Sequence, residues 1–285
     1  MLIQWHKMIW QVFFGKFKMD NKIKEIAIEA ARVGGEILVQ YFRSSLDVEV
    51  KSELSPLVSK ADREAEIAIR NIIINAFPKH VVQGEEFDDV VPGDSDDETI
   101  NWVIDPIDGT TAYLSGMPTF VVLIAVWQGN IPLLGLIYQP LTKDMWVGTK
   151  NGTVLNGNPI KVDDYPNQPL ILATTSPDYL STHTLKAFNE IRKVASVTQF
   201  GGDGHLYGSL ACGRISLIIE EGLKWHDVAA VVPIILGAGG NICTFSGDKI
   251  QPNKGSYSII ASASYALTNK FQSVLRDNVV GQVIS

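Results

Sequence analysis

Hydrophobic residues change their spacing twice along this chain, and the order of these changes restricts the fold. Apolar residues recur at helical spacing over 20–42 and 61–77, whereas 100–162 contains short strands separated by turns. From residue 170 onward, strands alternate with helices. Helices, then an antiparallel sheet, then alternating strands and helices predict layered α+β and α/β halves. We place the boundary between the halves near 150–168.

We divide the chain into three parts that follow this pattern. Residues 1–18 form an extension of unknown role, 19–155 an α+β half, and 156–285 an α/β half. The two halves are expected to form one integrated unit. The extension is rich in aromatic residues and lysine, and polar residues interrupt its apolar stretch, unlike a secretory signal. An amphipathic surface helix is the alternative interpretation of this extension.

Composition excludes several classes of protein. The chain has 285 residues with 24 basic and 31 acidic side chains, a formal net charge of -7, so we expect no nucleic-acid partner. No apolar run reaches the roughly 18–20 residues of a membrane helix, so we expect no membrane partner. Two cysteines, Cys212 and Cys243, cannot build a disulfide framework, and a reducing, cytoplasmic setting is predicted.

The segment from Trp102 to Thr111 carries the strongest functional signal. An apolar strand delivers Asp105 and Asp108 into a turn made by Pro106 and Gly109. Mg²⁺ takes oxygen ligands, usually one or two carboxylates together with phosphate oxygens of the substrate. Asp-Pro and Asp-Gly are also ordinary turn dipeptides, but the complete motif directly after a strand favours a metal site.

Two further strand ends also present acidic residues. Glu85 follows the strand at Val81–Val82, and Asp227 follows the acid-rich exit from the strand at Ile215–Ile219. Taken alone, Glu85 is a surface acid and Asp227 is a helix N-cap. Acids at three separate strand ends instead suggest that they converge on one metal site.

These motifs resemble the signatures of the inositol monophosphatase family, and the likeness extends from about residue 20 to the end. The resemblance implies a layered αβαβα sugar-phosphatase fold and an enzyme, usually a homodimer, that hydrolyses a small phosphorylated metabolite with Mg²⁺. The half 19–155 would then bind metal and phosphate, and the half 156–285 would lie on the substrate side of one integrated catalytic unit. Transferred residue by residue, the metal ligands are Glu85, Asp105, Asp108, Asp227 and the main-chain carbonyl of Ile107. The resemblance also assigns phosphate-binding amides to Gly109 and Thr110, an acid paired with the Thr110 hydroxyl to Asp62, and a loop lysine to Lys51.

The expected mechanism relies on positioning and charge neutralisation, because phosphoryl transfer leaves little covalent work to protein groups. Metal ions would activate a water molecule. Glu85, together with the Asp62–Thr110 pair, would take the proton of that water.

The second half of the chain carries a hint about the substrate. The loop Gly201–Tyr207 and the segment before Asp227 are more similar to the histidinol-phosphate phosphatase branch than to the inositol branch. Asp203 and Glu220 would then face the ammonium and imidazole of histidinol phosphate, or else the hydroxyls of an inositol ring. Thr111 departs from that branch and matches inositol phosphatases. Inositol-1-phosphate, other sugar or nucleotide phosphates, and a non-catalytic binding role therefore remain as alternatives.

Overall fold

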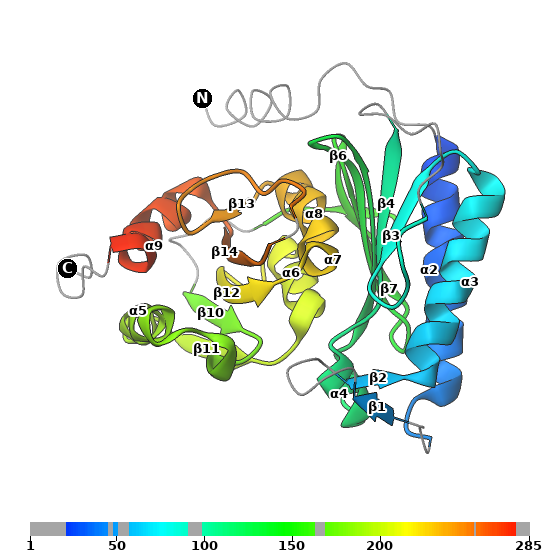
Figure 1. The fold of residues 1–285 in the computed structure, drawn as a ribbon. Helices are drawn as coiled ribbons and strands as arrows, with labels where there is room; N and C mark the ends of the chain where they lie inside the picture. The colour runs from blue at the N-terminus through cyan, green and yellow to red at the C-terminus, as the bar shows by residue number, and fades with distance from the viewer. Residues whose placement is uncertain are drawn as a thin grey trace.

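Helical and sheet layers alternate through the molecule (Figure 1). The computed structural model describes residues 21–44, 48–50, 57–90, 99–162, 169–253 and 255–277. The predictions for residues 1–18 and for Lys51 lie outside these ranges. Two helices cover a large sheet, three helices separate it from a smaller sheet, and two helices cover the far side (Figure 1). The predicted αβαβα fold class is therefore confirmed.

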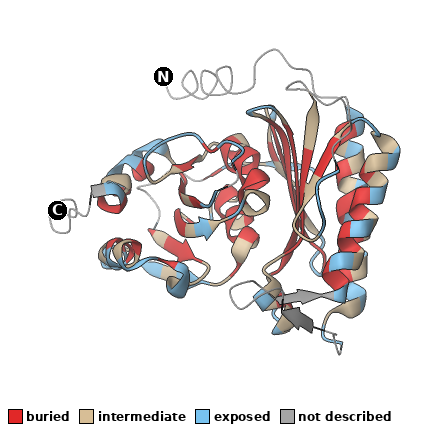
Figure 2. Cartoon of the chain, viewed as in Figure 1, coloured by how far each residue is buried: buried red, intermediate tan, exposed pale blue. Residues whose placement is uncertain are grey.

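The first layer consists of α2 (Asn21–Tyr41) and α3 (Lys60–Ala76), as the helical spacing predicts. A two-stranded sheet of β1 (Val48–Val50) and β2 (Leu57–Ser59) lies between them in the sequence. The helices approach closely at Gly34, where an added Cβ would lie 2.6 Å from Cδ1 of Ile69. Their buried faces join the large sheet in one hydrophobic core (Figure 2).

The large sheet has seven strands in chain order, from β3 to β9. They are β3 (Val81–Gly84), β4 (Ile100–Asp108), β5 (Val121–Gln128), β6 (Ile131–Gln139), β7 (Asp144–Thr149), β8 (Gly152–Leu155) and β9 (Asn158–Ile160). Strand β3 is parallel to β4, and all later neighbours are antiparallel. We predicted that β4 ends at Asp105, but it continues to Asp108 with a register shift against β5. Pro106 cannot donate to the strand ladder, which accounts for the irregularity.

The smaller sheet has five strands in the order β11-β10-β12-β14-β13. They are β10 (Ile171–Thr174), β11 (Val197–Phe200), β12 (Leu217–Leu223), β13 (Asn241–Thr244) and β14 (Tyr257–Ser262). The chain passes from the large sheet to this one between Ile160 and Ile171. The finer division at residues 155 and 156 stays a prediction.

Helices α6 (Asp203–Ala211), α7 (Trp225–Ala229) and α8 (Val231–Ala238) lie between the sheets. We predicted one helix over 226–236, and the structure has two, α7 and α8. Pro233 has no N–H that could donate to the carbonyl of Ala229. That carbonyl instead accepts a hydrogen bond from the indole N–H of Trp127 at 3.0 Å.

The outer layer consists of α5 (Thr182–Arg192) and α9 (Tyr265–Asp277). We predicted that α5 begins near Tyr179. A 3₁₀ turn at Pro177–Tyr179 precedes it instead, and the Ser181 side chain caps the helix by accepting from the Thr184 N–H. Within the described ranges, no helix has the length and apolar character needed to cross a membrane.

Candidate active site

The end of β4 places two carboxylates at the rim of the sheet. Asp105 is 2 % exposed, and its Oδ1 accepts from the N–H of Ile107 at 3.0 Å. The register shift after Asp105 lets Asp108 reach the same side of the strand end. Gly109 then adopts φ of 90°, a left-handed conformation that favours glycine, and the short helix α4 (Thr110–Leu114) begins directly after it.

A buried ion pair on α3 holds the loop that carries Glu85. Nε of Arg70 lies 2.7 Å from Oε1 of Glu66, and the guanidinium also donates to the carbonyls of Phe87 and Asp88. The second oxygen of Glu66 accepts from the N–H of Glu86 at 2.8 Å. This pair was not predicted from the sequence, although a Glu and an Arg four residues apart on a largely apolar helix face are an unusual signal.

Asp227 enters the site from the first turn of α7. Its Oδ2 accepts from the N–H of Lys224 at 2.6 Å, so the carboxylate belongs to a capping box whose N-cap residue is Lys224. Asp227 is therefore the third residue of the helix and not its N-cap, as the alternative interpretation had it. The other oxygen, Oδ1, lies 3.5 Å from Nε2 of His226.

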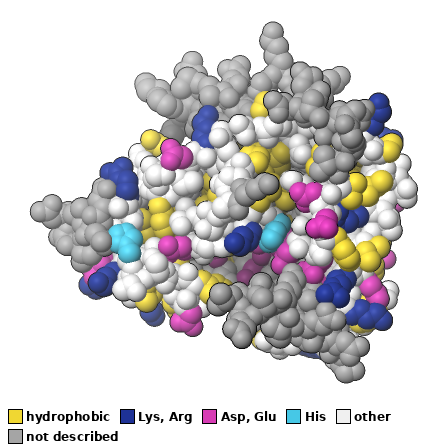
Figure 3. Space-filling view, viewed as in Figure 1, with side chains coloured by type: hydrophobic (Ala, Val, Ile, Leu, Met, Phe, Trp, Pro, Cys, Tyr) yellow, Lys and Arg dark blue, Asp and Glu magenta, His cyan; other side chains and the backbone are white. Residues whose placement is uncertain are grey.

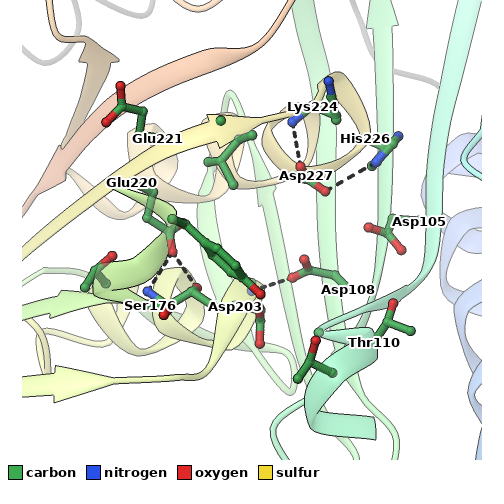
Figure 4. A pocket seen from close by; sticks show the side chains of 18 of the residues that line it. Asp105, Asp108, Thr110, Ser176, Asp203, Glu220, Glu221, Lys224, His226 and Asp227 are labelled. Carbon is green, nitrogen blue, oxygen red and sulfur yellow. Dashed lines mark hydrogen bonds and ion pairs between the residues drawn. The ribbon is translucent and has the colours of Figure 1, made fainter. Parts of the chain in front are cut away.

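These residues meet in one cleft of about 800 Å³ that is lined by residues from both halves of the chain. Figure 4 shows Asp105, Asp108 and Asp227 turned toward one another, with His226 beside them. Ligand atoms lie within 4.8 Å of one another in two groups: Asp105, Asp108 and Asp227, and Glu85, Asp105 and His226. Asp105 belongs to both groups, which is the arrangement expected of two neighbouring ion positions. His226 was not among the site residues that we predicted.

The crowded acids carry raised pKa values. Burial is the main cause of the raised pKa of Asp105, and the charges of Glu85 and Asp108 add to it. Burial likewise raises the pKa of Asp108, followed by the charges of Asp203 and Asp227. Figure 3 shows acidic side chains gathered in a hollow of the surface, beside a basic side chain and a histidine. Carboxylates, a carbonyl and one imidazole form a donor set that suits a divalent cation, whose charge would favour the ionised acids.

The Thr110 hydroxyl lies in the same turn as Ile107, and it donates to the Ile107 carbonyl at 3.0 Å. Its pairing with Asp62 stays a prediction. Asp62 is 1 % exposed at the start of α3. The charge of Asp62 also raises the pKa of Asp105, but less than burial and the charges of the other acids of the site do.

The predicted substrate residues, Asp203 and Glu220, both line the cleft but differ in their surroundings. Asp203 is the first residue of α6 and lies beside Gly109. A Cβ added to Gly109 would be 2.9 Å from Oδ2 of Asp203. Burial, and then the charge of Asp227, raise the pKa of Asp203 to about 6. Glu220 accepts from the N–H and hydroxyl of Thr175 and from the hydroxyl of Tyr207. Its two oxygens are therefore engaged within the protein.

Known proteins resemble this chain in sequence and in structure. An inositol monophosphatase from Zymomonas mobilis has the same fold with a TM-score of 0.78 at 34% identity, over 90% of this chain and 99% of that one. The chloroplastic bifunctional phosphatase IMPL2 of Arabidopsis thaliana is 39% identical over 81% of this chain and 67% of its own length. A histidinol-phosphatase of Chlorobaculum parvum is 33% identical over 78% of this chain and 84% of its own length.

The layered fold and the acid-lined cleft define a phosphatase of the sugar-phosphatase class. Residues 19–279 match the inositol monophosphatase family. The chain belongs to the inositol monophosphatase family, which confirms the resemblance seen in the sequence. Relatives of more than one specificity match the chain, so its branch within the family is a matter for proposal.

Proposed function

We propose that this protein is a Mg²⁺-dependent phosphomonoesterase that hydrolyses histidinol phosphate to histidinol and phosphate. The observation that carries the proposal is the convergence of acids from three strand ends on one cleft. Two ionised carboxylates within 4.8 Å repel each other by on the order of 3 kcal/mol at the effective dielectric constant of a protein surface. A fold gains nothing from such crowding unless a cation is bound there.

The proposed ligands are those that the family resemblance assigns. Glu85, Asp105, Asp108, Asp227 and the carbonyl of Ile107 would hold the ions. The Ile107 carbonyl already accepts from Thr110, but a carbonyl oxygen has a second lone pair for a metal ion. When bound, the ions would supply positive charge to the phosphate oxygens and would polarise the attacking water.

The chain itself supplies the remaining steps. We propose that the main-chain N–H groups of Gly109 and Thr110 bind the phosphate and orient it for attack. Glu85, whose side chain is 15% exposed in the cleft, would accept the proton of the attacking water. The Asp62–Thr110 pair would assist Glu85 in taking this proton.

Asp203 supports the choice of histidinol phosphate. In this substrate the ammonium is carried by the carbon next to the phosphorylated one, so it must lie close to the bound phosphate. The Asp203 carboxylate lies beside Gly109, at the proposed phosphate site, and could accept from that ammonium. Glu220 would instead orient Thr175 and Tyr207, because both its oxygens already accept hydrogen bonds from them.

Inositol-1-phosphate is the second candidate substrate, and a specific residue favours it. Thr111 follows the Asp108–Thr110 motif, as in inositol phosphatases, and it lines the cleft. Asp203 would then accept from a ring hydroxyl. A non-catalytic binding role is the weaker alternative, since every acid of the metal site is present. Homodimer formation and a cytoplasmic location stay predictions.

The test of substrate class compares Asp203→Asn with the wild type on two esters. Loss of a charge-assisted hydrogen bond costs on the order of 1.5–3 kcal/mol, so kcat/KM for histidinol phosphate should fall by about ten- to a hundredfold. A simple alkyl phosphate, which has no ammonium, should be affected much less. An equal fall for both esters would show that Asp203 supports the metal site, and faster wild-type turnover of inositol-1-phosphate would favour the second candidate.

A further inference from the structure

His226 places a ring nitrogen at the edge of the acidic site. Nε2 lies 4.0 Å from Oε2 of Glu85. One ligand atom each of Glu85, Asp105 and His226 lie within 4.8 Å of one another. Two ligand atoms that each lie about 2.2 Å from one ion can be at most about 4.4 Å apart. The imidazole and Glu85 are therefore close enough to share an ion. Among the described residues that line the cleft, His226 is the only histidine.

Packing of the preceding residue fixes the direction of this side chain. The Trp225 ring packs against Trp127 and Tyr257, with ring centroids 4.9 Å and 5.9 Å apart. It thereby anchors one face of α7 to the core between the sheets. Successive residues of a helix point about 100° apart, so anchoring Trp225 turns His226 toward the cleft. The capping contact between Lys224 and Asp227 holds the same turn from the other side.

Imidazole changes which ions such a site prefers. Mg²⁺ favours an all-oxygen shell, whereas imidazole nitrogen suits zinc and other first-row divalent ions. The His226 side chain is 22% exposed, so the ring is accessible from the cleft. A mixed set of two carboxylates and one imidazole is typical of these borderline ions rather than of Mg²⁺ alone.

We propose that His226 coordinates a first-row divalent metal ion together with Glu85 and Asp105, so that this position binds Zn²⁺ or Mn²⁺ more tightly than Mg²⁺. The inference rests on the proposed metal-dependent function and refines it: one ion position is nitrogen-coordinated, while the position at Asp105, Asp108 and Asp227 offers only oxygen.

The test is pulsed electron paramagnetic resonance of Mn²⁺ bound to the full-length protein, which detects a nitrogen-14 nucleus coordinated to the ion. We expect nitrogen modulation in the wild type and in a His183→Gln control, whose histidine lies on α5 and contacts the Leu275 carbonyl. We expect its loss in His226→Phe, which keeps a ring, and in His226→Gln, which keeps polarity. In both His226 variants the dissociation constant for Zn²⁺ should rise by about 10- to 100-fold, with little change for Mg²⁺.

The possible outcomes separate this inference from the proposed function. Bound Mn²⁺ without nitrogen modulation in the wild type would overturn the role of His226 and leave the metal-dependent phosphatase intact. Modulation that persists in both His226 variants would also overturn it. If the wild type binds no Mn²⁺, Zn²⁺ or Mg²⁺ at all, the proposed function fails together with the inference.

Discussion

Replacing Glu220 by glutamine should change how the metal-free protein responds to pH. Glu220 is 3% exposed, and burial raises its pKa to about 7 from an ordinary value of 4.5. Because the folded-state pKa lies above the unfolded one, the protonated form stabilises the fold. That contribution is complete below pH 4.5 and is lost as the pH rises through about 7. The pKa difference corresponds to on the order of 3 kcal/mol.

Glutamine fits the same hydrogen bonds without the charge. Its carbonyl can accept from the N–H and hydroxyl of Thr175, and its amide can donate to the oxygen of Tyr207. The free energy of unfolding of Glu220→Gln should therefore equal that of the wild type near pH 4.5. At pH 8 it should exceed the wild-type value by up to about 3 kcal/mol. Urea unfolding in excess chelator, followed by tryptophan fluorescence at both pH values, measures this difference.

Glu221→Gln is the matched control, because the neighbouring residue has the opposite shift. Burial tends to raise the pKa of Glu221, but hydrogen bonds from Thr184 and Ser181 outweigh it, and the pKa is lowered. Its ionised form stabilises the fold, so Glu221→Gln should lose stability at pH 8 and not gain it. The reasoning is refuted if Glu220→Gln is less stable than the wild type at pH 8, or if its difference from the wild type is the same at both pH values.

Two further substitutions test the site. Asp108→Asn should abolish turnover. The metal-free protein should keep or gain stability at pH 8, because one of several repelling charges is removed. Near-normal kinetics would show that Asp108 is only a turn residue. Arg70→Lys keeps the buried charge but loses hydrogen bonds to the Phe87 and Asp88 carbonyls. The apparent Mg²⁺ affinity, measured from the activation of turnover by Mg²⁺, should therefore fall by about tenfold. Arg32→Lys is the surface control. Unchanged activation would mean that α3 does not position Glu85.

Local patterns predicted the elements and the acidic site. The helices α2 and α3 follow from helical periodicity, and Asp105, Asp108 and Asp227 were expected at strand ends and meet in one cleft. Such features depend on residues close together in the sequence. A strand ending in Asp-Pro followed by Asp-Gly can be recognised without knowing what packs against it.

Features that depend on distant partners were missed. His226 points into the cleft because Trp225 packs against Trp127 and Tyr257, and one sequence does not reveal that rotation. Glu220 lines the cleft, and its role toward the substrate stays a prediction. Its hydrogen-bond partners were not predicted, because they come from the end of β10 and from α6 and only the folded arrangement brings them to it.

Phosphate release from histidinol phosphate, measured with Mg²⁺, with excess EDTA, and after Mg²⁺ is added back, tests the central claim most directly. The convergence of Glu85, Asp105, Asp108 and Asp227 predicts turnover with Mg²⁺, none in EDTA, and recovery when Mg²⁺ is restored. Thermal unfolding in the same buffers would show that the protein remains folded in EDTA, so that lost activity reports on the ion. Undiminished turnover in excess EDTA would contradict the claim that these acids act by holding metal ions.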